Sequence, residues 1–223
     1  MATTTIQGDV RVTGQLLAQS IKSTGSGTLT GADLTANAEI AATQMAQNAL
    51  QPYLVKLTDA RVWDAIQTVL PGTPGTDDLG LKNGTFGTES AHITAGDLKA
   101  AGATTRYARF LIPLPAEYEA AETVTLVISA GMLTTVADNT CTVDVECYKM
   151  DGDTTLSADL CATAATTINS LTFADKSFTI TPTALEPGHL LDVRIAIACN
   201  DAATVTAVEP VIGLITLKCD TRG

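Results

Sequence analysis

Short stretches in which apolar and polar residues alternate fill most of the chain after residue 54, and they predict β-strands. In residues 140–148 (TCTVDVECY), Cys and Val occupy one set of alternate positions, whereas Thr, Asp and Glu occupy the other. This pattern predicts a strand with one core face and one solvated face. Residues 124–128 and 193–198 are nearly continuous apolar runs. Such runs indicate either central strands or strands whose second face is covered by a neighbouring subunit.

Turn-forming residues separate these runs and set the expected fold class. Antiparallel strands at this spacing, without long helices between them, predict an all-β fold: an antiparallel β-sandwich of the jelly-roll type, with about seven to nine strands. Residues 57–65 fit either a first strand or a short helix, and residues 70–79 fit a long loop. The clearest strands are expected at residues 106–113, 123–130, 140–150, 170–181, 190–200 and 205–218.

The first 50 residues follow a different pattern and predict an extension ahead of the sandwich. Residues 1–23 have the composition of a short β-segment, and residues 24–28 (TGSGT) predict a loop. Residues 32–50 have apolar positions near a period of 3.6, which predicts a helix with Asp33 as N-cap and Pro52 as its stop. We therefore expect an extension at 1–50 and a sandwich at 51–223. The helical stripe is Leu34, Ala38, Ala42 and Met45; the apolar residues of the first segment are Ile6, Val10, Val12, Leu16, Leu17 and Ile21.

Composition and charge narrow the classes of function. Of 223 residues, 45% are hydrophobic and 37 are threonine, whose β-branched side chain favours strands. The formal net charge of −11 repels phosphate groups, so we expect no nucleic-acid partner. No stretch approaches the length of about 20 apolar residues that crosses a bilayer. The N-terminus lacks the basic and apolar regions of a secretory signal. We therefore expect no membrane partner.

The five cysteines predict buried thiols in a reducing compartment. Their number is odd and no CxxC pair occurs, which argues against a disulfide scaffold and against a zinc site. Two aspartates of a tight turn, Asp151 and Asp153, are a pair that either holds a cation or simply forms a hairpin. We expect no cofactor. The cysteines are Cys141, Cys147, Cys161, Cys199 and Cys219.

Candidate catalytic groups are few, and we expect no enzyme. His92 and His189 are the only histidines, and no GxSxG elbow accompanies them. The glutamates around Tyr118, which are Glu117, Glu119 and Glu122, resemble paired carboxylates of glycoside hydrolysis. Such sites usually carry several aromatic rings, whereas this chain has one tryptophan, Trp63. A sugar-binding sandwich needs less, because one tryptophan and a few polar groups suffice.

Three segments resemble phage structural proteins. Residues 8–16 (GDVRVTGQL) look like the β-repeats that open many phage fibre and decoration subunits, and residues 38–45 (AEIAATQM) are similar to segments of phage-like structural proteins. Residues 185–197 (LEPGHLLDVRIAI) resemble the PGDxLxVRI strand of trimeric jelly-roll phage proteins, with His189 in place of the usual Asp. The resemblance implies a structural virion protein: a homotrimeric capsid decoration (cement) or head-fibre subunit.

That resemblance sets the expected partners and location. The chain would form a homotrimer through the stripe of residues 34–45, and the apolar residues of segment 1–23 would attach it to the major capsid protein or another shell protein. It would be made in the host cytoplasm and displayed on the outer capsid surface of the virion. The alternative, in another class of function, is a carbohydrate-binding β-sandwich of a tail fibre or host-facing surface.

Overall fold

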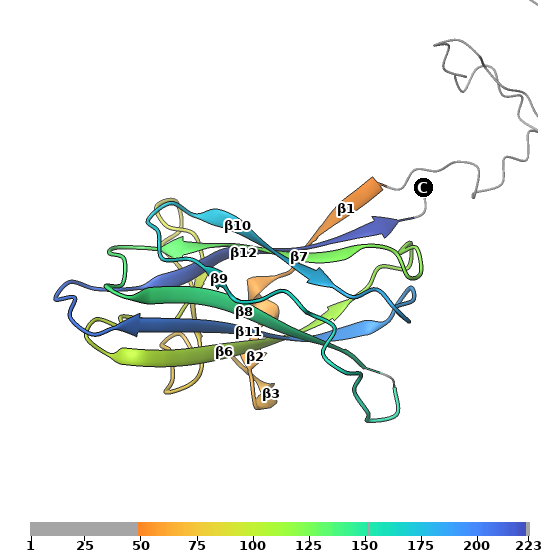
Figure 1. The fold of residues 1–223 in the computed structure, drawn as a ribbon, viewed down its shortest axis with the longest axis horizontal. Helices are drawn as coiled ribbons and strands as arrows, with labels where there is room; N and C mark the ends of the chain where they lie inside the picture. The colour runs from red at the N-terminus through yellow and green to blue at the C-terminus, as the bar shows by residue number, and fades with distance from the viewer. Residues whose placement is uncertain (1–48, 151, 222–223) are drawn as a thin grey trace, which may run out of the picture. The chain divides into compact units, whose positions relative to one another are not determined.

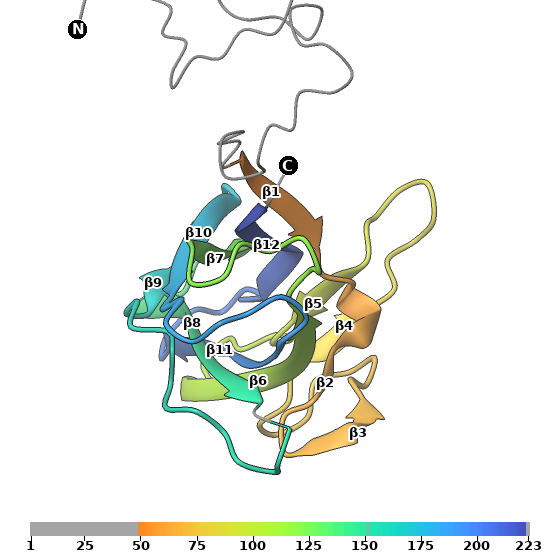
Figure 2. The ribbon, with the colours of Figure 1, turned by 90° about the vertical axis from the view of Figure 1, so that its right-hand side faces the viewer.

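The computed structural model describes residues 49–150 and 152–221, which form two antiparallel β-sheets packed face to face (Figures 1 and 2). Sheet A contains β1 (Ala49–Leu54), β4 (Gly80–Lys82), β5 (His92–Thr94), β7 (Val124–Met132), β10 (Ala174–Ile180) and β12 (Pro210–Thr221). Sheet B contains β2 (Arg61–Val62), β3 (Ala65–Val69), β6 (Gly102–Pro113), β8 (Thr140–Met150), β9 (Thr166–Thr167) and β11 (Leu190–Asp201). Among the residues that the structure describes, one 3-10 turn, η3, covers Leu57–Asp59.

The order of the strands is that of a jelly roll. Strands β5, β12, β7 and β10 lie side by side in sheet A, and β6, β11, β8 and β9 lie side by side in sheet B. Consecutive strands therefore alternate between the sheets from β5 to β8 and again from β9 to β12, while β8 and β9 are neighbours in sheet B. This is the arrangement in which two Greek keys form a sandwich. The expected all-β jelly-roll sandwich is confirmed, and β1–β4 extend its sheets.

Alternation of side chains builds the core between the sheets. In β8, Cys141, Val143, Val145 and Cys147 are buried, while the residues between them are partly exposed. The apolar run at 193–198 belongs to β11, which pairs with both β6 and β8 and so is a central strand. Its inward residues Val193, Ile195 and Ile197 lie in the core. Of the two explanations for this run, the central strand is the one observed.

The helix predicted for residues 32–50 is wrong at its C-terminal end. Residues 49–54 form strand β1, which pairs with β12 from Ala49 opposite Thr221 to Leu54 opposite Thr216. The inward residue Tyr53 pairs with Leu217 and packs against the core, and this contact outweighs a helical period made of small residues. Pro52 lies within the strand, where a missing N–H is tolerated because β1 is an edge strand.

The remaining predictions for the extension lie outside the described residues. These are the apolar residues of segment 1–23 and the stripe at Leu34, Ala38, Ala42 and Met45. The division at residue 50 stays a prediction, although β1 begins at Ala49. Within residues 49–150 and 152–221, no helix is long and apolar enough to span a membrane.

All five cysteines are buried in the sandwich with free thiols. Cys141 and Cys147 point into the core from the same strand, as the alternation predicted. Burial raises the pKa of Cys147 to about 12 and that of Cys219 to about 11. These thiols are therefore protonated at neutral pH and poor nucleophiles.

Three aspartates tie together the loops at one end of the sandwich. Asp201, at the end of β11, accepts hydrogen bonds from the backbone N–H of Ala100 (2.7 Å) and of Asp138 (2.9 Å), and from the Thr204 hydroxyl. Asp138 in turn accepts from the N–H of Ala202 (2.9 Å). Asp97 accepts from the N–H of Val208 (3.0 Å). These carboxylates join the β5–β6, β7–β8 and β11–β12 loops.

We expect Asp201→Asn to lower the melting temperature at pH 7 by about 5 °C, because the amide NH2 cannot accept from the N–H donors that the carboxylate serves. Burial alone would raise the pKa of Asp201, but its hydrogen bonds to Thr204, Asp138 and Ala100 outweigh burial and lower it below 3.8. The stabilisation is therefore fully present above the unfolded-state pKa and is lost as the pH falls through the lower pKa of the folded state.

The measurement is thermal unfolding followed by circular dichroism between about pH 7 and pH 2.5. The difference between native protein and variant should shrink below about pH 4. Asp175→Asn, at an exposed position of β10, is the matched control and should leave the melting temperature unchanged at every pH. An equal effect of both substitutions would contradict the role assigned to Asp201.

Candidate functional site

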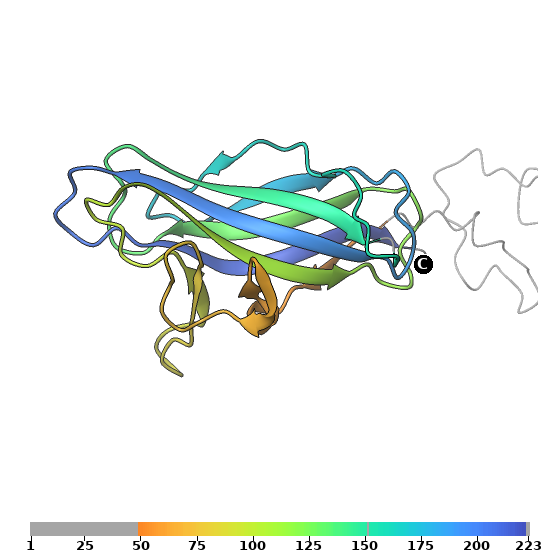
Figure 3. The ribbon, with the colours of Figure 1, turned by 90° about the horizontal axis from the view of Figure 1, so that it is seen from below.

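The outer face of sheet B is built on β6, β11 and β8, which lie side by side (Figure 3). Their pairing sets the outward side chains of the three strands in register. Each outward residue of β11 is paired with one residue of β6 and one of β8. Three neighbouring rows result, because outward residues recur at every second position. They are Thr105–Ala198–Thr142, Tyr107–Ala196–Asp144 and Arg109–Arg194–Glu146, with the β11 residue in the middle of each row.

A groove of about 180 Å³ follows β11 over these rows. Its floor is formed by Ala196 and Ala198, whose side chains end at Cβ, so the larger residues of β6 and β8 stand above them as walls. Arg194 and Glu146 border the groove on the side of the third row. The walls are Thr105 and Tyr107 on one side and Thr142 and Asp144 on the other, with Ala165 at the rim.

Arg194 joins the aromatic and acidic parts of this face. Its guanidinium lies 4.8 Å from the centre of the Tyr107 ring and 5.3 Å from that of the Trp63 ring. Nη2 also donates to Glu146 Oε1 at 2.5 Å. Because a guanidinium is planar, it can stack on a ring while its edge binds a carboxylate. Glu146 and the two rings therefore hold Arg194 in place, and Arg194 in turn fixes the positions of the rings.

Trp63, from the turn between β2 and β3, packs against two residues that line the groove, Tyr107 and Arg194. Its ring centre is 5.3 Å from that of Tyr107, with the ring planes tilted by 48°. Its indole Nε1–H donates to Asp77 Oδ2 at 3.2 Å. Both rings are partly exposed, so one aromatic surface borders the groove where the polar residues are.

Arg109 and Asp192 form a second ion pair on the same face. Arg109 Nε donates to Asp192 Oδ1 at 2.6 Å, and its Nη2 donates to the other oxygen, so the contact is bidentate. This hydrogen bonding raises the pKa of Arg109. The Asp192 side chain is 5% exposed, whereas that of Arg109 is 28% exposed. The pair is therefore structural support beside the groove.

Chemically, the groove offers hydrogen-bond acceptors and donors beside a flat apolar surface. Carboxylates accept from ligand O–H or N–H groups, the guanidinium and hydroxyls donate, and the ring faces contact C–H groups. Of its lining residues, none pairs a nucleophile with a histidine base. The arrangement suits binding of a polar ligand with an apolar face.

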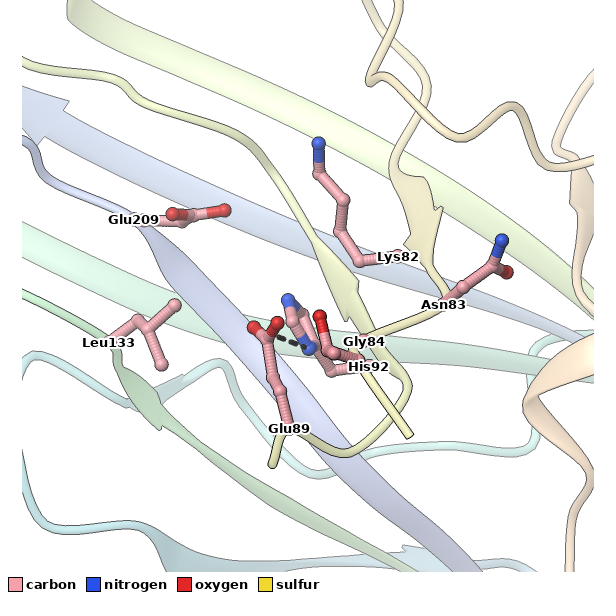
Figure 4. Close-up of a pocket in the computed structure, with 8 residues that line it drawn as sticks. Lys82, Asn83, Gly84, Glu89, His92, Leu133 and Glu209 are labelled. Atoms are coloured by element: carbon pink, nitrogen blue, oxygen red, sulfur yellow. Dashed lines mark ion pairs between the residues drawn. The ribbon is translucent and has the colours of Figure 1, made fainter. Parts of the chain in front are cut away.

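A second pocket, of about 420 Å³, lies at the loop between β4 and β5 (Figure 4). His92 Nδ1 lies 3.0 Å from the carbonyl oxygen of Ser90. A carbonyl only accepts, so we assign the proton to Nδ1, which leaves Nε2 as an acceptor. Glu209 accepts from the Thr94 hydroxyl at 2.9 Å. The lining consists of Lys82, Asn83, Gly84, Thr85, Glu89, His92, Leu133 and Glu209.

The two histidines that the sequence singled out lie apart and are each engaged locally. His92 Nδ1 is 3.9 Å from Glu89. His189 Nδ1 accepts from the N–H of Glu186 at 3.0 Å, so it stabilises the turn that enters β11. Thr85 is the one hydroxyl-bearing residue among those lining the pocket of His92. Neither histidine is part of a Ser–His–Asp arrangement among the described residues.

The glutamates at 117, 119 and 122 surround a structural tyrosine. Tyr118 is fully buried, and its hydroxyl donates to the carbonyl of Glu122 at 2.7 Å. Burial raises the pKa of Tyr118 to about 12. The Glu119 N–H donates to the carbonyl of Asp220, which fixes this loop to β12. The segment anchors the loop between β6 and β7.

In the turn that is a candidate cation site, the one described aspartate, Asp153, accepts hydrogen bonds from a neighbouring residue. Asp153 accepts from the N–H (3.1 Å) and the hydroxyl (2.6 Å) of Thr155, while Asp151 lies outside the described residues. In the part of the chain that the structure describes, no three His, Cys, Asp or Glu side chains are grouped so as to hold a metal ion.

The comparisons with known proteins found solved structures that are similar at low identity. No family model and no curated protein matches the sequence. Similar solved structures include the xylan-binding module CBM15 (13% identity, 78% of this chain and 100% of that chain, TM-score 0.41). Another is the CBM22-1 xylan-binding domain of Paenibacillus barcinonensis Xyn10C (11% identity, 78% and 99%, TM-score 0.39). A tailspike domain of bacteriophage CBA120 is also similar (12% identity, 64% and 18%, TM-score 0.31).

The identities of the similar structures are 8–15% and their TM-scores are below 0.5, so they carry no argument about this chain. The resemblance to phage decoration proteins stays a prediction, because no family model and no curated protein matches.

Replacing Arg194 should shift the fluorescence emission of Trp63 strongly and lower the free energy of unfolding only slightly. In Arg194→Ala, water replaces the guanidinium beside the indole, so the emission of Trp63 should shift to longer wavelength. The free energy of unfolding should fall by about 1 kcal/mol, the usual contribution of a partly exposed cation–π contact and ion pair.

Arg109→Ala is the matched control on the same face. It leaves the buried Asp192 unpaired, so the free energy of unfolding should fall by about 3 kcal/mol without a shift in native emission. Tryptophan fluorescence and urea unfolding of both variants make the comparison. A native-state emission shift in Arg109→Ala alone would contradict the assigned contacts.

Proposed function

We propose that the protein binds carbohydrate in the groove on the outer face of sheet B. The observation that supports this is the convergence, around one groove with an alanine floor, of the Tyr107 ring, a guanidinium and carboxylates, with Trp63 packed against Tyr107 and Arg194. Sugars present hydroxyl groups at the ring edge and C–H groups on the ring face, so they match a wall of polar groups next to an aromatic surface.

The positions of the side chains support binding to a preformed site. Arg194 is held by Glu146 and stacked on both rings, so little conformational entropy is lost when a ligand contacts it. Glu146 also accepts from the Tyr148 hydroxyl at 3.3 Å. The floor is backbone and Cβ of a central strand, which is the most rigid part of the sheet.

Affinity electrophoresis against a panel of neutral polysaccharides, followed by calorimetry with the one that retards the protein, tests the proposal. We expect Trp63→Ala to weaken binding about tenfold, which corresponds to about 1.4 kcal/mol. Ala196→Leu should abolish binding, because the added atoms fill the groove from its floor.

Ala116→Leu is the control, since Ala116 is exposed on the loop after β6 and does not line the groove. Circular dichroism should show all three variants folded. Retardation that survives Ala196→Leu would place the binding elsewhere, and the absence of binding to any glycan, neutral or charged, would refute the proposed function.

A second candidate function is the structural virion subunit, a homotrimer that joins a capsid or fibre. The observation that favours it is an apolar strip on β1, the strand that directly follows residues 1–48. Leu50 and Leu54 are 50% and 70% exposed. Leu54 also borders a groove of about 320 Å³ whose lining includes Leu111, Pro113 and Leu217. Both functions are compatible, since binding and assembly would use different faces.

Sedimentation velocity of the full chain tests the second candidate. We expect a trimer at micromolar concentration, and a shift to monomer when Leu50 and Leu54 are both replaced by Glu, because charges placed in an apolar contact cost free energy. Val205→Glu, at an 88% exposed position of the β11–β12 loop, is the control and should remain trimeric. A full chain that sediments only as monomer would exclude this candidate.

A further inference from the structure

Two acidic residues line the groove from β8, and they differ in their partners. Glu146 is engaged twice, by Arg194 and by Tyr148. Asp144 accepts one hydrogen bond, at 3.0 Å, from the N–H of the next residue, Val145. Its second oxygen has no hydrogen-bond partner and no cationic partner among the described residues. The groove therefore contains one carboxylate whose charge is not neutralised.

Asp144 lies across the groove from an aromatic ring. Ala196 is paired with Tyr107 on one side and with Asp144 on the other. Because adjacent strands are about 5 Å apart, the two wall residues are separated by about 10 Å at the backbone, over an alanine. A ligand that rests on Ala196 thus meets a π-face on one side and a carboxylate on the other.

Charges near the aromatic end increase the negative potential. Asp64 and Asp77 lie close enough to Asp78 that their charges, together with its burial, raise the pKa of Asp78. Asp77 is also the acceptor of the Trp63 indole N–H. Arg194, the cation that lines the groove, is already paired with Glu146. A ligand that enters the groove therefore meets one unpaired carboxylate, that of Asp144, while Asp77 lies beside Trp63 near the other end of the second row.

We propose that the groove selects glycans whose sugar units carry a free, protonated amine, with the ammonium group placed beside Asp144 and the ring against Tyr107. An ammonium donates up to three hydrogen bonds and forms a charge-assisted bond with a carboxylate, while the Tyr107 ring contacts the C–H groups of the sugar. Uronic acid and sulfated sugars are repelled by the same carboxylates. This inference rests on the proposed carbohydrate function and makes Asp144 its specificity-determining residue.

The test compares two tetramers that differ only in acetylation of the amine, and adds an acidic tetramer as a third ligand. The full chain is titrated with tetramers of β-1,4-linked glucosamine, with the fully N-acetylated tetramer and with a tetramer of galacturonic acid, by calorimetry. A pH of about 5.5 keeps both the carboxylate and the amine charged. We expect the free-amine tetramer to bind about tenfold more tightly than the N-acetylated one at low salt, and the uronic acid tetramer not to bind.

Asp144→Asn isolates the carboxylate, since the amide keeps its size and removes its charge. The preference for the free amine should fall to less than about twofold, and raising the salt to about 0.5 M should have the same effect on native protein. Asp175→Asn, on β10 of the other sheet, should keep the full preference.

The outcomes separate the inference from the proposed function. Equal binding of the two glucosamine tetramers, or a preference that survives Asp144→Asn, overturns the inference. If a neutral polysaccharide still binds and Ala196→Leu abolishes that binding, the carbohydrate function stands with a different specificity. If no glycan binds in either experiment, both are refuted.

Discussion

The pairing of β11 with β6 on one side and β8 on the other is the constraint on which the groove depends. The register places Tyr107, Ala196 and Asp144 in one row, and a shift by one residue would turn all three toward the core. That shift is opposed by Val193, Ile195 and Ile197, which are buried on the opposite face of the same strand. Burial of the core thus sets the geometry of the candidate site.

Much of this fold follows from the printed sequence. The strand at 140–150 was predicted at its observed bounds, and the buried parity of Cys141 and Cys147 was predicted with it. Those predictions succeed because alternation is a local property of a half-buried strand. The end of the predicted helix failed at Ala49 and Leu50, since its small apolar residues fit either period and the contact of Tyr53 with the core decided the outcome.

The site was less accessible to sequence reasoning. Trp63 was noted as the single tryptophan, and alternation exposed Asp144 and Glu146, but their neighbours come from strands 40 or more residues away in the chain. Arg194 lies between two apolar residues and carries no local signal that it stacks on Trp63 and Tyr107. The histidines drew attention by rarity alone, and each is engaged within three residues of itself.

The alanine floor has an evolutionary consequence. Ala196 and Ala198 contribute only a methyl group to the surface, while the inward residues that flank them carry the packing of β11. If the groove binds glycans as proposed, ligand preference and folding free energy are therefore encoded by separate sets of residues along one strand. A lineage could exchange wall residues such as Thr105 or Thr142, or enlarge the floor, and explore new ligands while the sandwich itself stays under unchanged selection.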